Sequence, residues 1–336
     1  MKQLITRLCE TYGPSGHEGQ VREYIKSEIG SLADSVRVDV MGNLIAVKGP
    51  AGGAVAARRV MVAAHMDEIG LIVTHIDDDG FLRFAAIGGV HPATLVGNRV
   101  VFADGVKGVI GAEEKGSQPN EFPRLDRLFL DIGAAGKDEA GRMVAVGDVC
   151  AFDRPCVEAG QRLVAKAMDD RIGCAVLVEV LRGLKASPHE VSFVFTVQEE
   201  VGVRGAITST YGVNPDVAIA VDITATGDVP EARTLSISLG KGPAIKVKDR
   251  GMIAHAGLKS HMFEVAKDLA IPFQPEVLEL GSTDAMAMQM SRGGVPAGVV
   301  SIPTRYAHSP SEMIDMRDVS GAVNLLLGLL SRPFPF

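Results

Sequence analysis

The stretch VSFVFTVQEEVGVRGA, Val191 to Ala206, decides the fold class of this chain. Its first seven residues, Val191 to Val197, are apolar or β-branched apart from Ser192. A run this short and continuous predicts a strand that is buried on both faces of a sheet. It leads into Glu199 and Glu200, and two adjacent carboxylates in a poorly solvated place raise each other's pKa. A bound cation would remove that cost, whereas the alternative is a pair of solvated glutamates.

Three further apolar runs end in polar side chains of the same kind. VMVAAHMDEIG (60–70) leads to His65 and Asp67, and DVAIAVDIT (216–224) leads to Asp222. PAGVVSIPTRYAHSPSE (296–312) leads to His308. In open α/β sheets, ligands bind beyond the carboxyl ends of the strands. Four strands that each deliver His, Asp or Glu at that end therefore predict one shared site.

Composition excludes several classes of protein. The chain has 336 residues, enough for two compact units, and a formal net charge of −7, which argues against a nucleic-acid-binding surface. No apolar run approaches the roughly 20 residues needed to span a bilayer. The N-terminal sequence MKQLITRLCETYG is typical of an amphipathic helix, not of a signal peptide, and the four cysteines show no CxxC spacing. These features predict a cytoplasmic protein without membrane or nucleic-acid partners.

The pattern along the chain predicts an α/β domain interrupted by an all-β domain. Ser15 and Glu18 have the spacing of a helix capping box, and residues 36–49 are typical of a hairpin. Short β-type runs without a helical period fill the stretch from Leu71 to about Arg162. We therefore predict an α/β domain of residues 1–70 and 163–336 and an inserted β-barrel-like domain of residues 71–162. Within the α/β domain, SISLGKGPAIKV (236–247) predicts a strand pair.

Five side chains are candidate metal ligands. Imidazole and carboxylate groups without thiolate suit Zn²⁺, Co²⁺ or Mn²⁺ in a catalytic site. Two histidines and three carboxylates are too many for one tetrahedral ion with an open position. They fit two divalent ions about 3.5–4 Å apart, bridged by a carboxylate and a water. The five candidates are His65, Asp169, Glu200, Asp222 and His308.

Neighbouring acidic residues suggest supporting roles. Glu199 and Glu200 face opposite sides of an extended segment, so Glu199 is left free to act as a general base. Asp67 lies two residues after His65 and could orient its imidazole. Asp169 and its neighbour Asp170 lie at the start of a predicted helix, where N-capping is the alternative explanation for one of them.

Seven motifs, HMDE, KAMDDRIG, QEEVGVRGA, AVDIT, GKGPAI, GSTDA and RYAHSPSEM, occur in an order that resembles the M42 family of dinuclear metallo-aminopeptidases. The family includes tetrahedral and glutamyl aminopeptidases, and the resemblance runs from the first helix to the last. It implies a zinc-peptidase-like α/β/α sandwich, related to the M18, M20 and M28 enzymes, with an inserted small all-β domain. Some members are labelled cellulase M-like or endoglucanases. A glycosidase needs two carboxylates and no metal cluster, so these residues give that label little support.

The resemblance also implies a role for each candidate residue. The catalytic residues would be Glu199 as general base and Asp67 as the orienting acid, and Asp170 would bind no metal. The metal assignments are His65 and Asp222 for one ion, Glu200 and His308 for the other, and Asp169 as the bridge.

The expected function is a cytoplasmic, two-metal aminopeptidase that removes N-terminal residues from peptides. A metal-bridging hydroxide would be the nucleophile, with Glu199 as its base and with Zn²⁺ or Co²⁺, or else Mn²⁺, as the ions. By resemblance, the chain should form a homo-oligomer, a dodecamer built from dimers. One alternative is an M20-type deacylase or carboxypeptidase on the same scaffold. The other is a non-catalytic, metal-stabilised assembly protein, against which a spare base at Glu199 argues.

Overall fold

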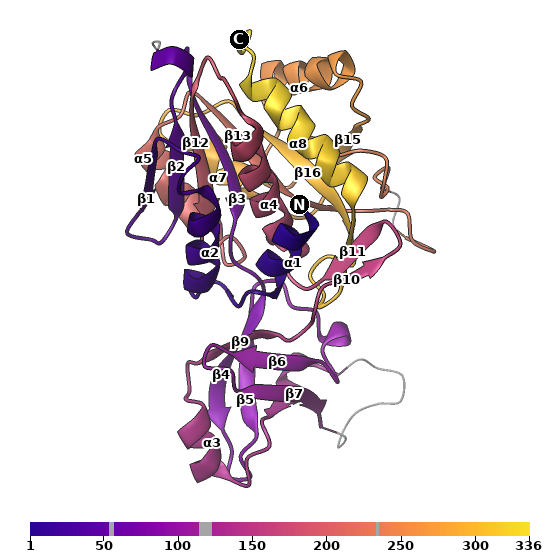
Figure 1. Ribbon diagram of the computed structural model, residues 1–336. Helices are drawn as coiled ribbons and strands as arrows, with labels where there is room; N and C mark the ends of the chain where they lie inside the picture. The colour runs from indigo at the N-terminus through magenta and orange to yellow at the C-terminus, as the bar shows by residue number, and fades with distance from the viewer. Residues whose placement is uncertain (54–56, 114–122, 233–234) are drawn as a thin grey trace.

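The protein consists of a large helix-covered sheet and a smaller closed β-barrel below it in the view of Figure 1. The computed structural model describes residues 1–53, 57–113, 123–232 and 235–336. This arrangement confirms the predicted α/β sandwich with an inserted all-β domain. None of the helices in these ranges combines the length and apolar character that crossing a bilayer requires.

The strand predicted from the opening stretch lies in the middle of the large sheet. Strand β12 (Glu190–Thr196) pairs in parallel with β3 (Arg59–His65) and antiparallel with β2 (Leu44–Lys48). Phe193 and Phe195 pack into the core on one face, and Val194 packs into a second core on the other. Because side chains alternate across a strand, an apolar residue at nearly every position fills both cores. The prediction of a strand buried on both faces is confirmed.

The large sheet is mixed, with parallel strands at its centre and antiparallel strands toward its edges. Strands β12, β3, β13 and β16 run parallel to one another. The predicted hairpin is confirmed as β1 paired with β2. The strand order is β1 (Ser35–Val38), β2, β12, β3, β13 (Val217–Ala225), β16 (Ala297–Arg305), β17 (Glu312–Asp315), β11 (Arg162–Ala165) and β10 (Val157–Ala159), with β14 (Ala244–Lys248) and β15 (Gln274–Val277) attached beside β16.

Helices cover both faces of this sheet (Figure 1). The long helix α4 (Met168–Gly183) crosses the middle of one face, where it contacts β3 and β13. The same layer contains α1 (Lys2–Glu10), α2 (Gly19–Ile29), α6 (Ala256–Asp268) and α8 (Met316–Leu330). The opposite face carries α5 (Arg204–Val213) and α7 (Asp284–Gln289).

The barrel lies between β3 and β11 in the chain. Its strand order is β4 (Gly70–Ile76), β5 (Leu82–Ile87), β8 (Leu128–Asp131), β7 (Lys107–Ala112), β6 (Arg99–Phe102) and β9 (Val149–Phe152). Helix α3 (Lys137–Met143) packs against β4, and short 3-10 turns lie at Ala51–Gly53, Pro92–Thr94 and Leu125–Arg127. The strand β10, at 157–159, pairs with β11 in the large sheet, so barrel strands end before it. The division of the chain at residues 71 and 162 stays a prediction.

A buried ionic network fixes the loop that follows β3. Arg171, at the start of α4, and Lys166 both contact the carboxylate of Glu68, with Lys166 Nζ 2.7 Å from Glu68 Oε2. All three side chains are buried, so loss of one partner would leave an uncompensated charge in the interior. The guanidinium also donates to four backbone carbonyls, those of Leu8, Thr11, Gly13 and Met66.

The predicted capping box is wrong. Within the described residues, α2 has no side-chain cap. Glu18 instead accepts hydrogen bonds from the backbone N–H groups of Gly16 and Gln198, and the hydroxyl of Ser15 donates to Asp67 at 2.6 Å. These two side chains therefore link the N-terminal segment to the loops at the carboxyl ends of β3 and β12.

The strand pair predicted for residues 236–247 is also wrong. Only Ala244–Lys248 of this stretch is a strand, and it pairs with β15 and β16. Gly242 has a left-handed φ of +95°, and a Cβ there would overlap with the carbonyl of Pro272. The Gly-Lys-Gly segment is thus a close backbone approach and not the turn of a hairpin.

Candidate metal centre

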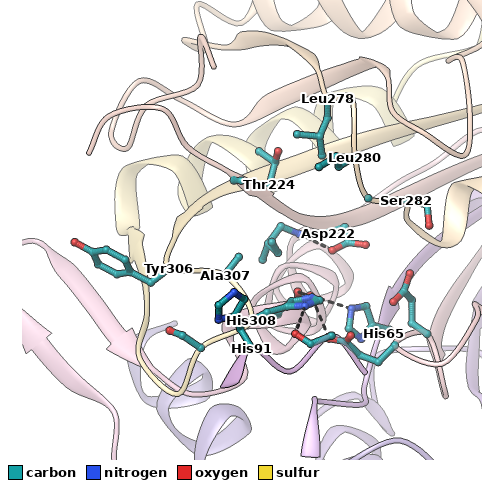
Figure 2. A pocket seen from close by; sticks show the side chains of 18 of the residues that line it. His65, His91, Asp222, Thr224, Leu278, Leu280, Ser282, Tyr306, Ala307 and His308 are labelled. Atoms are coloured by element: carbon teal, nitrogen blue, oxygen red, sulfur yellow. Dashed lines mark hydrogen bonds and ion pairs between the residues drawn. The ribbon is translucent and has the colours of Figure 1, made fainter. Parts of the chain in front are cut away.

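The predicted site residues meet at the carboxyl edge of the parallel strands. His65 is the last residue of β3, and its partner in β12 is Thr196, so the Glu199-Glu200 segment begins beside it. Figure 2 shows His65, Asp222 and His308 around the same space. This space is a cavity of about 1470 Å³, which Asp169, Glu199 and Glu200 also line.

The carboxylate of Asp169 lies between the two histidines. Nε2 of His65 is 3.0 Å from one carboxylate oxygen of Asp169, and Nε2 of His308 is 3.2 Å from the other. Nε2 of His308 is also 3.5 Å from Oε1 of Glu200. Among the described residues, that glutamate oxygen is buried without a hydrogen-bond partner. Asp169 thus contacts both imidazoles, one through each of its carboxylate oxygens.

A backbone carbonyl oxygen lies within hydrogen-bond distance of Nδ1 in each of the two imidazoles. Nδ1 of His65 is 3.1 Å from the carbonyl oxygen of Asp67, and Nδ1 of His308 is 3.0 Å from that of Gly89. A proton on each Nδ1 would leave Nε2 as the metal-binding nitrogen once a cation replaces the proton that Nε2 shares with Asp169. This is the tautomer that metal-binding histidines adopt when a carbonyl accepts from their other ring nitrogen.

The Asp67 side chain does more than was predicted from its spacing to His65. Its carboxylate is 3.4 Å from Nδ1 of His65, farther than the carbonyl oxygen of the same residue. Its two oxygens accept hydrogen bonds from the backbone N–H groups of Glu199 and Glu200, at 2.9 and 3.1 Å. Asp67 therefore positions the Glu199-Glu200 segment directly.

Two further buried carboxylates were missed in the sequence, although both lie in the quoted motifs. Glu312 accepts from the backbone N–H groups of Asp169 and His308, at 3.0 and 2.7 Å. The backbone of His308 has a left-handed φ of +58°. A residue other than glycine keeps this conformation only when its surroundings hold it there. Asp284, in GSTDA, accepts from the hydroxyl of Thr196 at 2.5 Å. The spacing of four residues between His308 and Glu312 was the signal available for the first.

Asp170 makes the backbone contacts of an N-capping residue. One of its oxygens accepts from the N–H of Gly173, three residues along α4, and the other from the N–H of His65. It also lies near His65 and Asp222, because donor atoms of these three residues fall within 4.8 Å of one another. The capping alternative considered for this pair of aspartates thus describes Asp170.

The site contains more carboxylates than cations. Burial, helped by the charge of Asp169, raises the pKa of Glu200 to about 7 and that of Asp222 well above its usual range. Burial opposes ionisation of Asp169 too, but its bonds to His308 and His65 hold its pKa below the usual range. The bond to Asp169 in turn raises the pKa of His308 to about 11.

Divalent cations fit this set of donors. In their absence, protons on the imidazoles and carboxyl groups would have to balance the negative charge, and metal binding replaces such protons. The donors are nitrogen and carboxylate oxygen without sulfur, which suits zinc, cobalt or manganese. The unpartnered oxygen of Glu200 supports the same conclusion.

Comparison with known proteins gives the family. The chain matches the M42 glutamyl aminopeptidase family over residues 42–325. It belongs to the M42 family. The lysyl aminopeptidase of Pyrococcus furiosus is 36% identical to this M42 chain over 346 residues, 99% of this chain and 97% of that protein.

Solved structures agree in fold over the whole chain. Aminopeptidase APDkam598 from Desulfurococcus kamchatkensis is 41% identical, with a TM-score of 0.95 over 99% of this chain and 95% of that one. The TET1 peptidase of Pyrococcus horikoshii, which can assemble into a tetrahedron or a large octahedral shell, is 33% identical. Its TM-score is 0.88 over 99% of both chains.

The predicted family and enzyme class are confirmed. This M42 chain is a peptidase of an aminopeptidase family, with groups that could hold metal ions. The alternatives of an M20-type deacylase and of a non-catalytic assembly protein receive no support from these comparisons.

The contact between the Gly89 carbonyl oxygen and His308 predicts that the barrel increases the metal affinity of this M42 chain. A Cβ at Gly89 would overlap with the imidazole of His308, so Gly89→Ala should displace that ring. Loss of a partner that orients a metal-binding histidine typically lowers metal affinity about 10–100-fold. We expect a loss of that size for one ion, measured by titration with a chromophoric chelator.

Gly141→Ala is the matched control, because Gly141 is exposed on α3 of the same barrel and a Cβ there meets no atom within 4 Å. It should leave metal affinity unchanged. Equal affinities for the Gly89 variant and the control would show that the barrel does not orient His308.

Proposed function

We propose that this protein is a dinuclear metal-dependent aminopeptidase that removes N-terminal residues from peptides. The proposal rests on one observation, two overlapping groups of candidate ligands that share His65. Donor atoms of His65, Asp169 and Glu200 lie within 4.8 Å of one another, and those of His65, Asp170 and Asp222 form a second such group. Two adjoining groups of this kind support a pair of ions.

The assignment of ligands follows the geometry around Asp169. Asp169 serves both ions, because its two oxygens face different histidines. His308 and Glu200 hold one ion and His65 and Asp222 hold the other. Asp170 is assigned to no metal, because its two oxygens accept the backbone N–H groups of His65 and Gly173; the second group then keeps His65 and Asp222 as its ligands.

Divalent ions held by these residues would supply polarisation of the scissile carbonyl and a lowered pKa for the attacking water. Glu199 then takes the proton of that water and gives it to the leaving amine. Burial raises the pKa of Glu199 well above its usual range, which is the direction that suits a group that both accepts and donates a proton near neutral pH. Asp67 holds this residue in place through its backbone N–H. Carboxylates of the site bind the free α-amine of the substrate, which restricts cleavage to the first residue.

Glu199→Gln tests the base. The change preserves shape but removes the proton acceptor, so both metals should stay bound while kcat falls roughly 10²–10⁴-fold. Metal content by elemental analysis is measured beside peptide turnover. Glu23→Gln, at an exposed position of α2, is the control and should retain the normal rate. A metal-loaded Glu199→Gln enzyme with near-normal turnover would refute the assignment.

Three substitutions test the ligand assignment. Asp169→Asn should weaken the binding of both ions, because the bridging carboxylate contacts both, whereas Asp222→Asn should mainly weaken one. Asp170→Asn should keep both ions. Metal content per subunit after dialysis distinguishes these outcomes. If Asp170→Asn loses both ions and Asp169→Asn keeps them, the bridge is the neighbouring residue.

A further part of the proposal is that this chain forms a dodecamer built from dimers. It is supported by the solved dodecamer of PhTET1 and by the ability of the Pyrococcus horikoshii TET1 peptidase to assemble into a tetrahedron or an octahedral shell. A closed shell would admit short peptides and exclude folded proteins. Multi-angle light scattering of the metal-loaded protein should give a mass twelve times that of one chain. Chelation should lower this mass if metal binding stabilises the assembled state. A metal-loaded monomer with full peptidase activity would contradict the shell.

A further inference from the structure

The N-terminal turn, defined as residues 13–18 with the sequence GPSGHE, lies between α1 and α2 at the end of the large sheet nearest the barrel (Figure 1). Its backbone is fixed to the loop that follows β3. Gly13 donates its N–H to Oε1 of Glu68 at 3.1 Å, and its carbonyl oxygen accepts the N–H of Glu68 at 3.2 Å. Pro14 forms a β-bridge with the same residue. The turn therefore has a fixed place beside His65 and Asp67.

Two side chains of the turn contact the segment that carries the proposed base. The hydroxyl of Ser15 donates to Oδ2 of Asp67 at 2.6 Å, and that oxygen also accepts the backbone N–H of Glu200. Oε1 of Glu18 accepts the backbone N–H of Gln198 at 3.1 Å. Three successive backbone N–H groups, beginning with that of Gln198, thus donate to carboxylates that the turn supplies or orients.

The backbone before the proposed base needs such support. Gln198 has a left-handed φ of +56°, which a residue other than glycine keeps only when its surroundings hold it there. Glu199 is the next residue, so a rotation of the backbone at Gln198 would move its carboxylate. A displacement of about 1 Å in a catalytic group can lower a rate about 10²-fold.

The contacts of the turn are protected from water. Ser15 is 8% exposed and Glu18 is 4% exposed, so water has little access to replace a lost hydrogen bond. Oε1 of Glu18 also accepts the N–H of Gly16 at 2.7 Å, which holds the carboxylate in its orientation within the turn. Hydrogen bonds to an ionised carboxylate are about twice as strong as neutral ones. Of the described residues that line the cavity, none belongs to the turn.

We infer that Ser15 and Glu18 are positioning residues, which hold the carboxylate of Glu199 in place for proton transfer without contacting the substrate. This inference rests on the proposed role of Glu199 as the general base. A positioning role of this kind affects the chemical step more than substrate binding. Loss of either side chain should therefore lower kcat and leave KM nearly unchanged.

The first test compares Ser15→Ala and Glu18→Ala with the unchanged enzyme, each with Zn²⁺ or Co²⁺ in excess. Activity is measured on the aminoacyl p-nitroanilide that the unchanged enzyme cleaves fastest, and metal content is measured beside it. We expect kcat to fall at least about tenfold in each variant, with the same metal content and with KM within about twofold. Ser27→Ala, at an exposed position of α2, is the control and should keep the normal rate.

The second test repeats both substitutions in the Glu199→Gln enzyme. If the turn acts through the base, either change should lower kcat less than about twofold further, because the group that it positions is already lost. An equal fall in both backgrounds would show an effect independent of Glu199 and would overturn the inference. Normal rates in Ser15→Ala and Glu18→Ala beside a slow Glu199→Gln enzyme would overturn it too, and would leave the proposed function intact. A Glu199→Gln enzyme of normal rate would refute the base itself.

A conservative variant distinguishes the hydrogen bond from the charge. Both backbone N–H groups bound by Glu18 donate to the same oxygen, Oε1, and the amide oxygen of a glutamine can accept both. Glu18→Gln should therefore recover most of the rate that Glu18→Ala loses. A folded Glu18→Gln enzyme as slow as Glu18→Ala would contradict the positioning role of this residue.

Discussion

The carboxylate of Asp169, held between Nε2 of His65 and Nε2 of His308, is the contact on which the rest of the site depends. His65 ends β3 and His308 lies in the turn after β16, and β13 separates these two strands in the sheet. Asp169 comes from the first turn of a helix on one face. The parallel strands and the helix that crosses one face of the sheet bring these three residues together. The fold thus gathers charged side chains at one edge of the sheet.

Backbone N–H groups stabilise most of this gathered charge. Asp67, Asp170 and Glu312 each accept two of them, from segments that also carry candidate ligands. Each carboxylate is thus stabilised, and each ligand-bearing loop is fixed, by the same contacts. Behind them, Arg171 and Lys166 balance Glu68, so that the charges of this supporting layer are paired within the protein. The cavity side differs, because the oxygen of Glu200 that faces His308 has no hydrogen-bond donor among the described residues.

The elements that the sequence predicted well are those with a local pattern. A continuous apolar run such as 191–197 predicts a buried strand, and polar side chains at its end are then expected at the sheet edge. The capping box failed because Ser15 and Glu18 have the right spacing for local bonds, yet long-range partners, Asp67 and Gln198, compete for the same atoms. The pairing of Lys246 with Glu276 joins residues 30 positions apart on β14 and β15, and no spacing rule reveals it. The sequence thus predicted which side chains meet in the cavity, and it did not reveal the partners that shift their pKa values.

The barrel contacts the candidate metal site, and this contact limits which sequence changes the inserted domain can accept. Gly88 and Gly89 follow β5, and a side chain at either would overlap with Glu200 or His308. The insertion is therefore not a freely exchangeable module. A barrel grafted from a relative would have to bring its own pair of small residues to the same place, and lengthening that loop would be tolerated only where it leaves this junction intact. Sequence change in the inserted domain is therefore constrained at Gly88 and Gly89, where the barrel meets the candidate ligands.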